Sequence, residues 1–280
     1  MNEDNIGLEI AKEAVKEVAN DIYVDAGRPI AKPSGELIGL IPRAIKAALS
    51  PLEKWVMQRE YNIAETQKLL ELKLQNVSPE LIEPPEPYIA VPALQYISYC
   101  MDCDELRDMY ANLLANSMNK VVKNGVHPGF VEIIKQICPD EAKILKYINF
   151  YKVIPSITLR YVRNSGGGID IIKNFSDVGE KSGCENPRDV AKYFDNLVRL
   201  GLIVEAGGLS SLTDKTRYEP LKSHKWVMPL ATNEKAQTRG FDKIDFEEGF
   251  FMISSYGKSF CQVCLDTQKA FVVEMKESDD

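Results

Sequence analysis

The feature that most constrains this chain is an apolar stripe at helical spacing in the segment 102–125. Its members recur every three or four residues: Leu106, Met109, Tyr110, Leu113, Leu114, Ser117, Met118 and Val121. This spacing is typical of a helix that is buried on one side. Asp102 and Asp104 are acidic residues of the kind that favour the N-terminus of a helix, and Asn124 and Gly125 are of the kind that end one. The segment therefore predicts a long helix with one face in the core.

Two further helices are predicted directly after it, each with a proline at its start. His127 and Pro128 precede one apolar stripe, and Cys138 and Pro139 precede the next. Proline suits the first helical turn, where no backbone N–H is needed. Asp140 and Glu141 would face the positive end of the third helix. We therefore expect the N-terminal half to be a helical domain.

Two runs within these helices resemble the bacterial abortive-infection alpha family. They are NLLANSM, from Asn112 to Met118, and HPGFVEIIKQICPDEAKIL, from His127 to Leu145. The resemblance covers roughly Gly35 to Ile148 and weakens towards the C-terminus. It departs at Cys138, where the family pattern suggests a serine-like cap. The resemblance implies a role in defence against bacteriophage and brings no catalytic chemistry with it.

Three polar residues in these runs are candidate interaction residues: Asn112, Asn116 and His127. Asparagine is a poor helix former, so side-chain hydrogen bonds to a neighbouring element explain the first two, with a ligand contact as the alternative. His127 begins a helix, where capping or packing is the expected role. The only other histidine is His224, and with so few histidines we expect neither a nucleophilic triad nor an HxxxH metal site. We therefore predict no enzyme.

The six cysteines include two CxxC pairs, Cys100 with Cys103 and Cys261 with Cys264. Paired CxxC motifs are typical of zinc sites. These two pairs are far apart, and neither has the glycine or aromatic residues that help a loop wrap around a metal. We therefore expect structural thiols, no metal and no cofactor.

After Ile148 the pattern changes to that of a winged-helix-like α+β domain, residues 151–280. A helix beginning after Asn186 has the core stripe Val190, Tyr193, Phe194, Leu197, Val198 and Leu200. A strand follows it, then a long polar insertion (207–248), a returning strand and a closing helix. Arg188, Lys192 and Arg199 on the helix are candidate nucleic-acid contacts. Groove-reading helices usually have more positive charge around them, so protein interaction is the alternative.

The N-terminal region is predicted to contain an amphipathic helix and linker (1–34), followed by a helical domain (35–150). Its segment 35–55 is apolar but too short and too charged to span a bilayer. It would pack against other helices, or lie at a membrane surface through Arg43, Lys46, Leu49, Leu52 and Trp55. Five prolines between Pro79 and Pro92 predict an extended strap.

The charge and composition of the chain limit the functions and cellular locations that we expect for it. The net charge is −7, which makes the whole chain a poor general nucleic-acid binder. The first residues are acidic and lack the apolar core of a signal peptide, so we expect a cytoplasmic protein with reduced thiols, or one that contacts the inner membrane peripherally.

The predicted fold class is mainly α, with a helical N-terminal domain and a small α+β winged-helix-like C-terminal domain. The predicted function is non-enzymatic anti-phage defence of the abortive-infection type through protein contacts. The partner would be another protein, a second copy or a phage component. The alternatives are a winged-helix DNA-binding transcriptional regulator and a membrane-active toxin that uses the segment 35–55.

Overall fold

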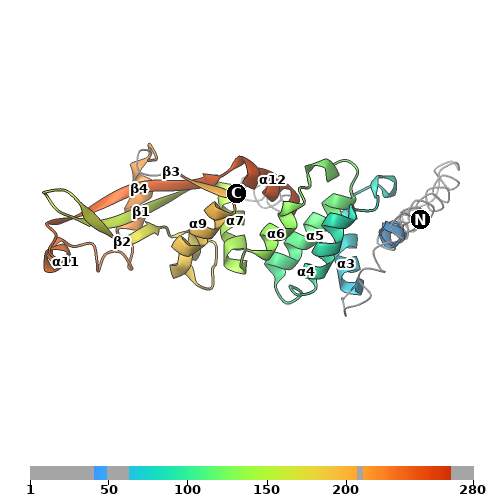
Figure 1. The fold of residues 1–280 in the computed structure, drawn as a ribbon, viewed down its shortest axis with the longest axis horizontal. Coiled ribbons are helices and arrows are strands. Elements are labelled where there is room, and N and C mark those ends of the chain that lie inside the picture. The colour runs from blue at the N-terminus through green and yellow to red at the C-terminus, as the bar shows by residue number, and fades with distance from the viewer. Residues whose placement is uncertain (1–40, 49–62, 207–210, 266–280) are drawn as a thin grey trace, which may run out of the picture. The chain divides into compact units, whose positions relative to one another are not determined.

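A computed structural model describes residues 41–48, 63–206 and 211–265. These residues form helices and one antiparallel sheet (Figure 1). The chain has two compact units: unit 1 is Met1–Gln136 with Gln262–Asp280, and unit 2 is Ile137–Cys261. The predicted mainly helical protein with an α+β part is confirmed. The division differs from the predicted boundary at residue 150, because α7 (Pro139–Tyr151) packs against the helices and strands of unit 2.

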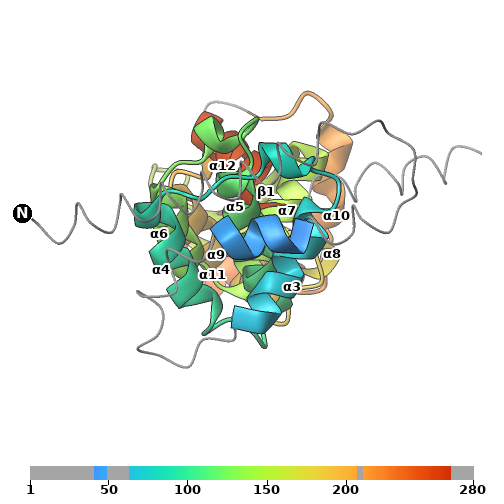
Figure 2. The same ribbon diagram turned by 90° about the vertical axis from the view of Figure 1, so that its right-hand side faces the viewer.

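Unit 1 is built around α5 (Asp104–Met118). This helix packs against α3 (Ile63–Leu74), α4 (Pro87–Ile97) and α6 (Gly129–Lys135), as Figure 2 shows. Short 3-10 turns, η1 (Pro79–Leu81) and η2 (Lys123–Gly125), lie between these helices in sequence. The predicted stripe supplies the part of the core that lies on α5: Met109, Tyr110, Leu113, Leu114, Ser117 and Met118 are buried.

The helix α5 ends at Met118, six residues before the predicted stop at Asn124. The backbone N–H of Glu83 donates to the carbonyl of Met118 (2.8 Å), and that of Lys120 donates to Leu81 (2.9 Å). These bonds pair the chain after α5 with the segment 81–83, so continuing the helix would forfeit them. Val121 is consequently 69% exposed, and its predicted place in the stripe is wrong.

The proline-rich segment is less extended than predicted. The helix α4 begins at Pro87, in a position that needs no N–H, and continues through Pro92. Pro92 cannot donate to the carbonyl four residues earlier, which costs helix stability. Burial of Ile89, Ala90, Ala93 and Ile97 offsets that cost. The predicted strap is therefore wrong from Pro87 onwards.

Unit 2 has a four-stranded antiparallel sheet of order β2-β1-β4-β3. The strands are β1 (Val153–Val162), β2 (Gly168–Phe175), β3 (Ile203–Ala206) and β4 (Lys243–Ile253). The helices are α7, α8 (Val178–Lys181), α9 (Val190–Arg199), α10 (Glu219–Lys222), α11 (Asn233–Thr238) and α12 (Ser255–Cys264), with 3-10 turns η3 (Pro187–Asp189) and η4 (Lys215–Tyr218). The end of α12, from Gln262, belongs to unit 1.

One face of the sheet packs against α9. The Phe194 ring of this helix stacks on Phe251 of β4, with ring centroids 4.0 Å apart and both side chains fully buried. The predicted start of the helix after Asn186 and Pro187 is confirmed as η3 leading into α9. Val198, by contrast, is 38% exposed and does not belong to the core as predicted.

The opposite face of the sheet is covered by the segment between β3 and β4. Ile157 and Leu159 of β1 pack there against Tyr218, Leu221 and Val227. The predicted long polar insertion (207–248) therefore contains a second core and the first half of β4. Its apolar residues follow neither helical nor strand spacing, because they come from short turns, and the sequence pattern missed them.

A buried carboxylate joins α7 to the start of α9. Asp140 is 5% exposed and accepts hydrogen bonds from the backbone N–H groups of Glu185 and Asn186 (both 2.9 Å) and from the Tyr193 hydroxyl (3.0 Å). The Lys143 ammonium lies 3.6 Å away. Burial acts to raise the pKa of Asp140, but the Asn186, Glu185 and Tyr193 hydrogen bonds and the Lys143 charge outweigh it and lower the pKa.

Candidate functional site: an apolar strip at the sheet edge

The sheet face covered by the β3–β4 segment is not covered along its whole length. Near β3 it carries two cross-strand rows of apolar residues, which we call the edge strip: Val153, Met252 and Val204, then the buried Pro155 with the partly exposed Phe250 and Ala206. Val204 is 43% exposed and Met252 is 36% exposed. Directly before β1, the side chains of Phe150 and Tyr151 are also exposed. An apolar patch of neighbouring side chains at a surface is typical of a protein-contact site.

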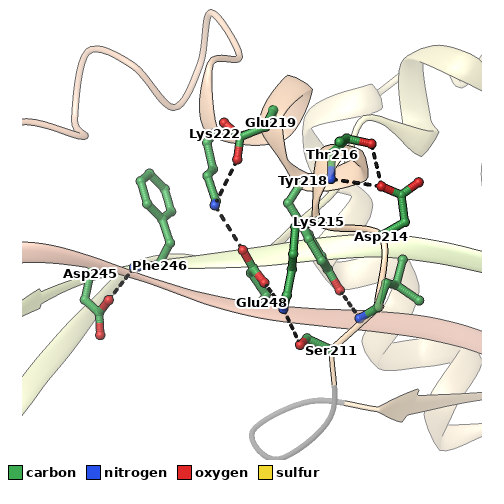
Figure 3. Close-up of polar contacts among 11 residues, drawn as sticks. Ser211, Asp214, Lys215, Thr216, Tyr218, Glu219, Lys222, Asp245, Phe246 and Glu248 are labelled. Atoms are coloured by element: carbon green, nitrogen blue, oxygen red, sulfur yellow. Dashed lines mark hydrogen bonds and ion pairs between the residues drawn. The ribbon is translucent and has the colours of Figure 1, made fainter.

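The covered part of this face ends at Glu248, the residue of β4 two positions before Phe250. Its carboxylate accepts hydrogen bonds from Lys215 of η4 (2.6 Å) and Lys222 of α10 (3.0 Å), as Figure 3 shows. Burial acts to raise the pKa of Glu248, but the two ammonium groups outweigh it and lower the pKa. The ion pairs thus hold η4 and α10 on the sheet beside the edge strip.

The edge strip borders an edge strand. The sheet order gives β3 a strand partner, β4, on one side only within the described residues. The strand has neither a proline nor a lysine, and its pairing with β4 is free of bulges. Natural proteins commonly use prolines, lysines and bulges to keep edge strands from pairing with other chains, and β3 keeps only two other protective features, its length of four residues and the exposed Glu205. The outer side of β3 is therefore suited to pairing with another strand.

The predicted interaction residues of unit 1 have partners within that unit. The side-chain amide of Asn112 donates to the carbonyl of Cys264 (3.0 Å), and that of Asn116 donates to Val263 (2.8 Å). They satisfy carbonyls that the end of α12 leaves without intrahelical donors. His127 Nδ1 accepts from the Gly129 N–H (3.0 Å), which caps the start of α6.

The predicted nucleic-acid residues of α9 and η3 are exposed but engaged locally. Lys192 pairs with Asp189 (2.6 Å), and Arg199 donates to the Asn196 side-chain oxygen (2.7 Å). The Arg188 guanidinium lies over the Trp226 ring, 4.9 Å from its centroid. Because these contacts already use the charged groups of the three residues, fewer of those groups are available to bind a phosphate backbone.

The predicted membrane residues fall partly outside the described residues. Residues 41–48 form a helix, on which Arg43 and Lys46 are exposed while Ala44, Ile45 and Ala48 are buried. Leu49, Leu52 and Trp55 lie outside the described residues. In the part of the chain that the structure describes, no helix has the length and apolar character needed to cross a bilayer.

All six cysteines carry thiols. Cys261 and Cys264 are buried, whereas Cys100 and Cys103 are partly exposed. Across the described ranges, no group of three or more His, Cys, Asp and Glu side chains is arranged to hold a metal ion.

A family model described as abortive infection alpha matches residues 58–264, more than half of the chain. The chain belongs to the abortive infection alpha family. The resemblance expected for residues 35–148 therefore begins later and extends much further, through the whole of unit 2. Membership of the abortive infection alpha family indicates a function related to abortive infection.

The other comparisons add little. No curated protein matches the sequence. A solved structure of an uncharacterised protein from the hydrocarbon-degrading marine bacterium Alcanivorax borkumensis SK2 is 19% identical, with a TM-score of 0.34. The match covers 48% of this chain and 90% of that one. It is too distant to inform the fold or the function.

The edge strip was missed at the level of sequence. Alternating apolar residues in a strand predict a buried face, and nothing in the pattern of β4 separates covered Phe246 from exposed Met252. The charged Glu248 between them is the one sequence cue, because it interrupts the apolar face at the border of the strip.

Proposed function

We propose that this protein acts in abortive infection without catalysing a reaction, through protein contacts made by the edge strip. The observation that carries the proposal is the exposure of Val204 and Met252 beside an edge strand. Supporting it, both histidines have structural partners: His127 caps α6, and His224 lies 2.7 Å from the Glu180 carboxylate. The protein's activity then depends on what its surface binds.

The occupant that best fits the strip is a second copy of the chain. Two β3 strands would pair antiparallel about a two-fold axis, extending the sheet from one copy into the other. A register centred on Glu205 would oppose two carboxylates, which is unfavourable. A register centred on Val204 opposes two valines and joins the strips of both copies into one apolar surface. We therefore infer the Val204-centred register.

The first test is the substitution Val204→Lys, which would oppose two ammonium groups across the axis. We expect the dimer dissociation constant to rise at least about tenfold, equal to about 1.4 kcal/mol, because apolar contact is replaced by repulsion. Sedimentation equilibrium measures this change. Phage plaquing efficiency on cells that carry the variant should return towards that of cells without the gene.

Val198→Lys is the matched control, because Val198 is a similarly exposed valine on α9, outside the strip. It should keep both the dimer and the protection. A monomeric wild-type chain, or a Val204→Lys dimer as stable as wild type, would contradict the assignment of the second copy. Full protection by a monomeric Val204→Lys variant would rule out the edge strip as the acting surface.

A second candidate function, DNA binding, is favoured by the topology of unit 2. Apart from the helical insertion between β3 and β4 and the closing helix α12, its order of elements is helix, strand, hairpin strand, two helices and two strands. This order and the adjacency β3-β4-β1 are compatible with a winged helix that has one added strand. Residues 137–261 carry 18 Lys and Arg against 16 Asp and Glu, a net charge of +2 within a chain of −7. In this proposal α9 would enter the major groove.

The double substitution Arg188→Glu/Lys192→Glu tests that candidate. If both residues contact phosphates, the slope of log affinity against log salt should fall by roughly 1.8, since each contact contributes about 0.9. Fluorescence anisotropy with duplex DNA over a salt series measures it. Val204→Lys should bind DNA as wild type does, and unchanged binding by the double variant would exclude α9 as the reading helix.

A further inference from the structure

Cys100 and Cys103 stand at the two ends of one tight turn. The backbone N–H of Cys103 donates to the carbonyl of Cys100 (3.0 Å), which closes a four-residue turn between α4 and α5. Such a turn brings its first and last Cα atoms to within about 7 Å, and disulfides join residues whose Cα atoms are about 4.4–6.8 Å apart. The backbone therefore already provides a separation that a disulfide needs.

The turn is fixed from one side and reachable from solvent. The Arg107 guanidinium donates to the carbonyl of Met101 inside the turn (2.5 Å) and to the Asp104 carboxylate (2.6 Å). Both cysteine side chains are partly exposed. Burial and then the nearby Cys103 raise the pKa of Cys100, which lowers the fraction of this thiol that is present as thiolate at a given pH.

We propose that Cys100 and Cys103 form a thiol–disulfide exchange site that takes low-molecular-weight disulfides such as oxidised glutathione. One cysteine thiolate attacks the reagent's S–S bond, forming a mixed disulfide and releasing one reagent thiol. The second cysteine thiolate attacks the protein sulfur of that mixed disulfide and releases the second reagent thiol. The two cysteines lose two electrons and two protons, and the reagent disulfide is reduced to two thiols.

The chain contains its own comparison pair. Cys261 and Cys264 have the same CxxC spacing, but both are buried on α12, and desolvation raises the pKa of Cys261 to about 12. Thiol exchange requires a thiolate that the reagent can reach. The two pairs therefore have the same spacing but differ in solvent exposure. A difference in their reactivity would show that exposure, rather than the CxxC spacing alone, makes a pair reactive.

The experiment uses the folded full chain in buffers of reduced and oxidised glutathione, followed by acid quenching, unfolding, alkylation and peptide mass spectrometry. Tryptic cleavage after Lys73 and Arg107 isolates Cys100 and Cys103, and cleavage after Lys258 and Lys269 isolates Cys261 and Cys264. We expect the first peptide to lose two hydrogens without an adduct. It should do so at least roughly tenfold faster than the second, because only its sulfurs are accessible.

Single substitutions test the two-step route. Cys100→Ser and Cys103→Ser should each trap a glutathione adduct on the remaining cysteine, with circular dichroism reporting the fold. Serine is a good helix N-cap, so Cys103→Ser should keep the start of α5. A wild-type peptide that stays doubly alkylated across the whole series overturns the proposal. So does a wild-type mixed disulfide that never resolves, or equal oxidation of both pairs.

Discussion

Replacing Asp140 with alanine is expected to lower the free energy of unfolding by about 3–5 kcal/mol, the range seen when one partner of a buried charged network is removed. The substitution leaves three donors without an acceptor: the Glu185 and Asn186 N–H groups and the Tyr193 hydroxyl. Each unsatisfied buried group costs about 1–3 kcal/mol. Urea unfolding followed by circular dichroism measures the loss.

Asp189→Ala is the control for this experiment. Asp189 is also an aspartate that binds a lysine, Lys192, but its side chain is 47% exposed, so its loss should cost no more than about 1 kcal/mol. Equal losses for the two variants would contradict the structural role assigned to Asp140.

The same carboxylate makes a pH prediction. Because the folded pKa of Asp140 lies below its unfolded value, its stabilising effect is complete above the unfolded pKa and is lost as the pH falls through the folded one. The unfolded value is about 3.9. Asp140→Asn should therefore have a lower free energy of unfolding than wild type at neutral pH, and the difference should shrink as the solution is made acidic.

Replacing Gly257 with alanine is expected to cost about 3 kcal/mol or more. A Cβ at this position of α12 would lie 1.9 Å from the carbonyl oxygen of Leu202 and 2.8 Å from its carbon. These are backbone atoms of the residue directly before β3, so no side-chain rotation relieves the clash. The helix must move away from the strand, and overpacking of this kind costs about 1–3 kcal/mol even where neighbours are flexible. Thermal unfolding monitors the effect.

Gly125→Ala provides the matched control. A Cβ at Gly125 meets nothing within 4 Å, and its backbone is not in the left-handed region. Alanine there should be neutral or stabilise by about 0.4–1 kcal/mol, because it restricts the unfolded chain. Comparable destabilisation by both substitutions would mean that α12 does not approach Leu202 as described.

The sequence predicted those elements whose signals are local. Pro139 at the first position of α7 and Pro187 before α9 are found as expected, because proline fixes its own backbone at a helix start.

What the sequence missed depends on partners distant in the chain. The end of α5 at Met118 is set by bonds to residues 81–83. The core under η4 and α10 needs β1, which lies more than 50 residues earlier. The edge strip is exposed because the segment between β3 and β4 does not extend over it. The spacing of apolar residues within β3 or β4 cannot show how far that segment extends.

The division of unit 1 between the two ends of the described chain affects how the protein is made. Asn112 and Asn116 bond to carbonyls 152 and 147 residues later. At about 5–20 residues per second, a ribosome needs roughly 7–30 s to reach those acceptors after synthesising α5. During that interval the ribosome synthesises the whole of unit 2, and unit 1 still lacks the segment of α12 that Asn112 and Asn116 contact. The completed unit 1 therefore appears only after the whole of unit 2 has been translated.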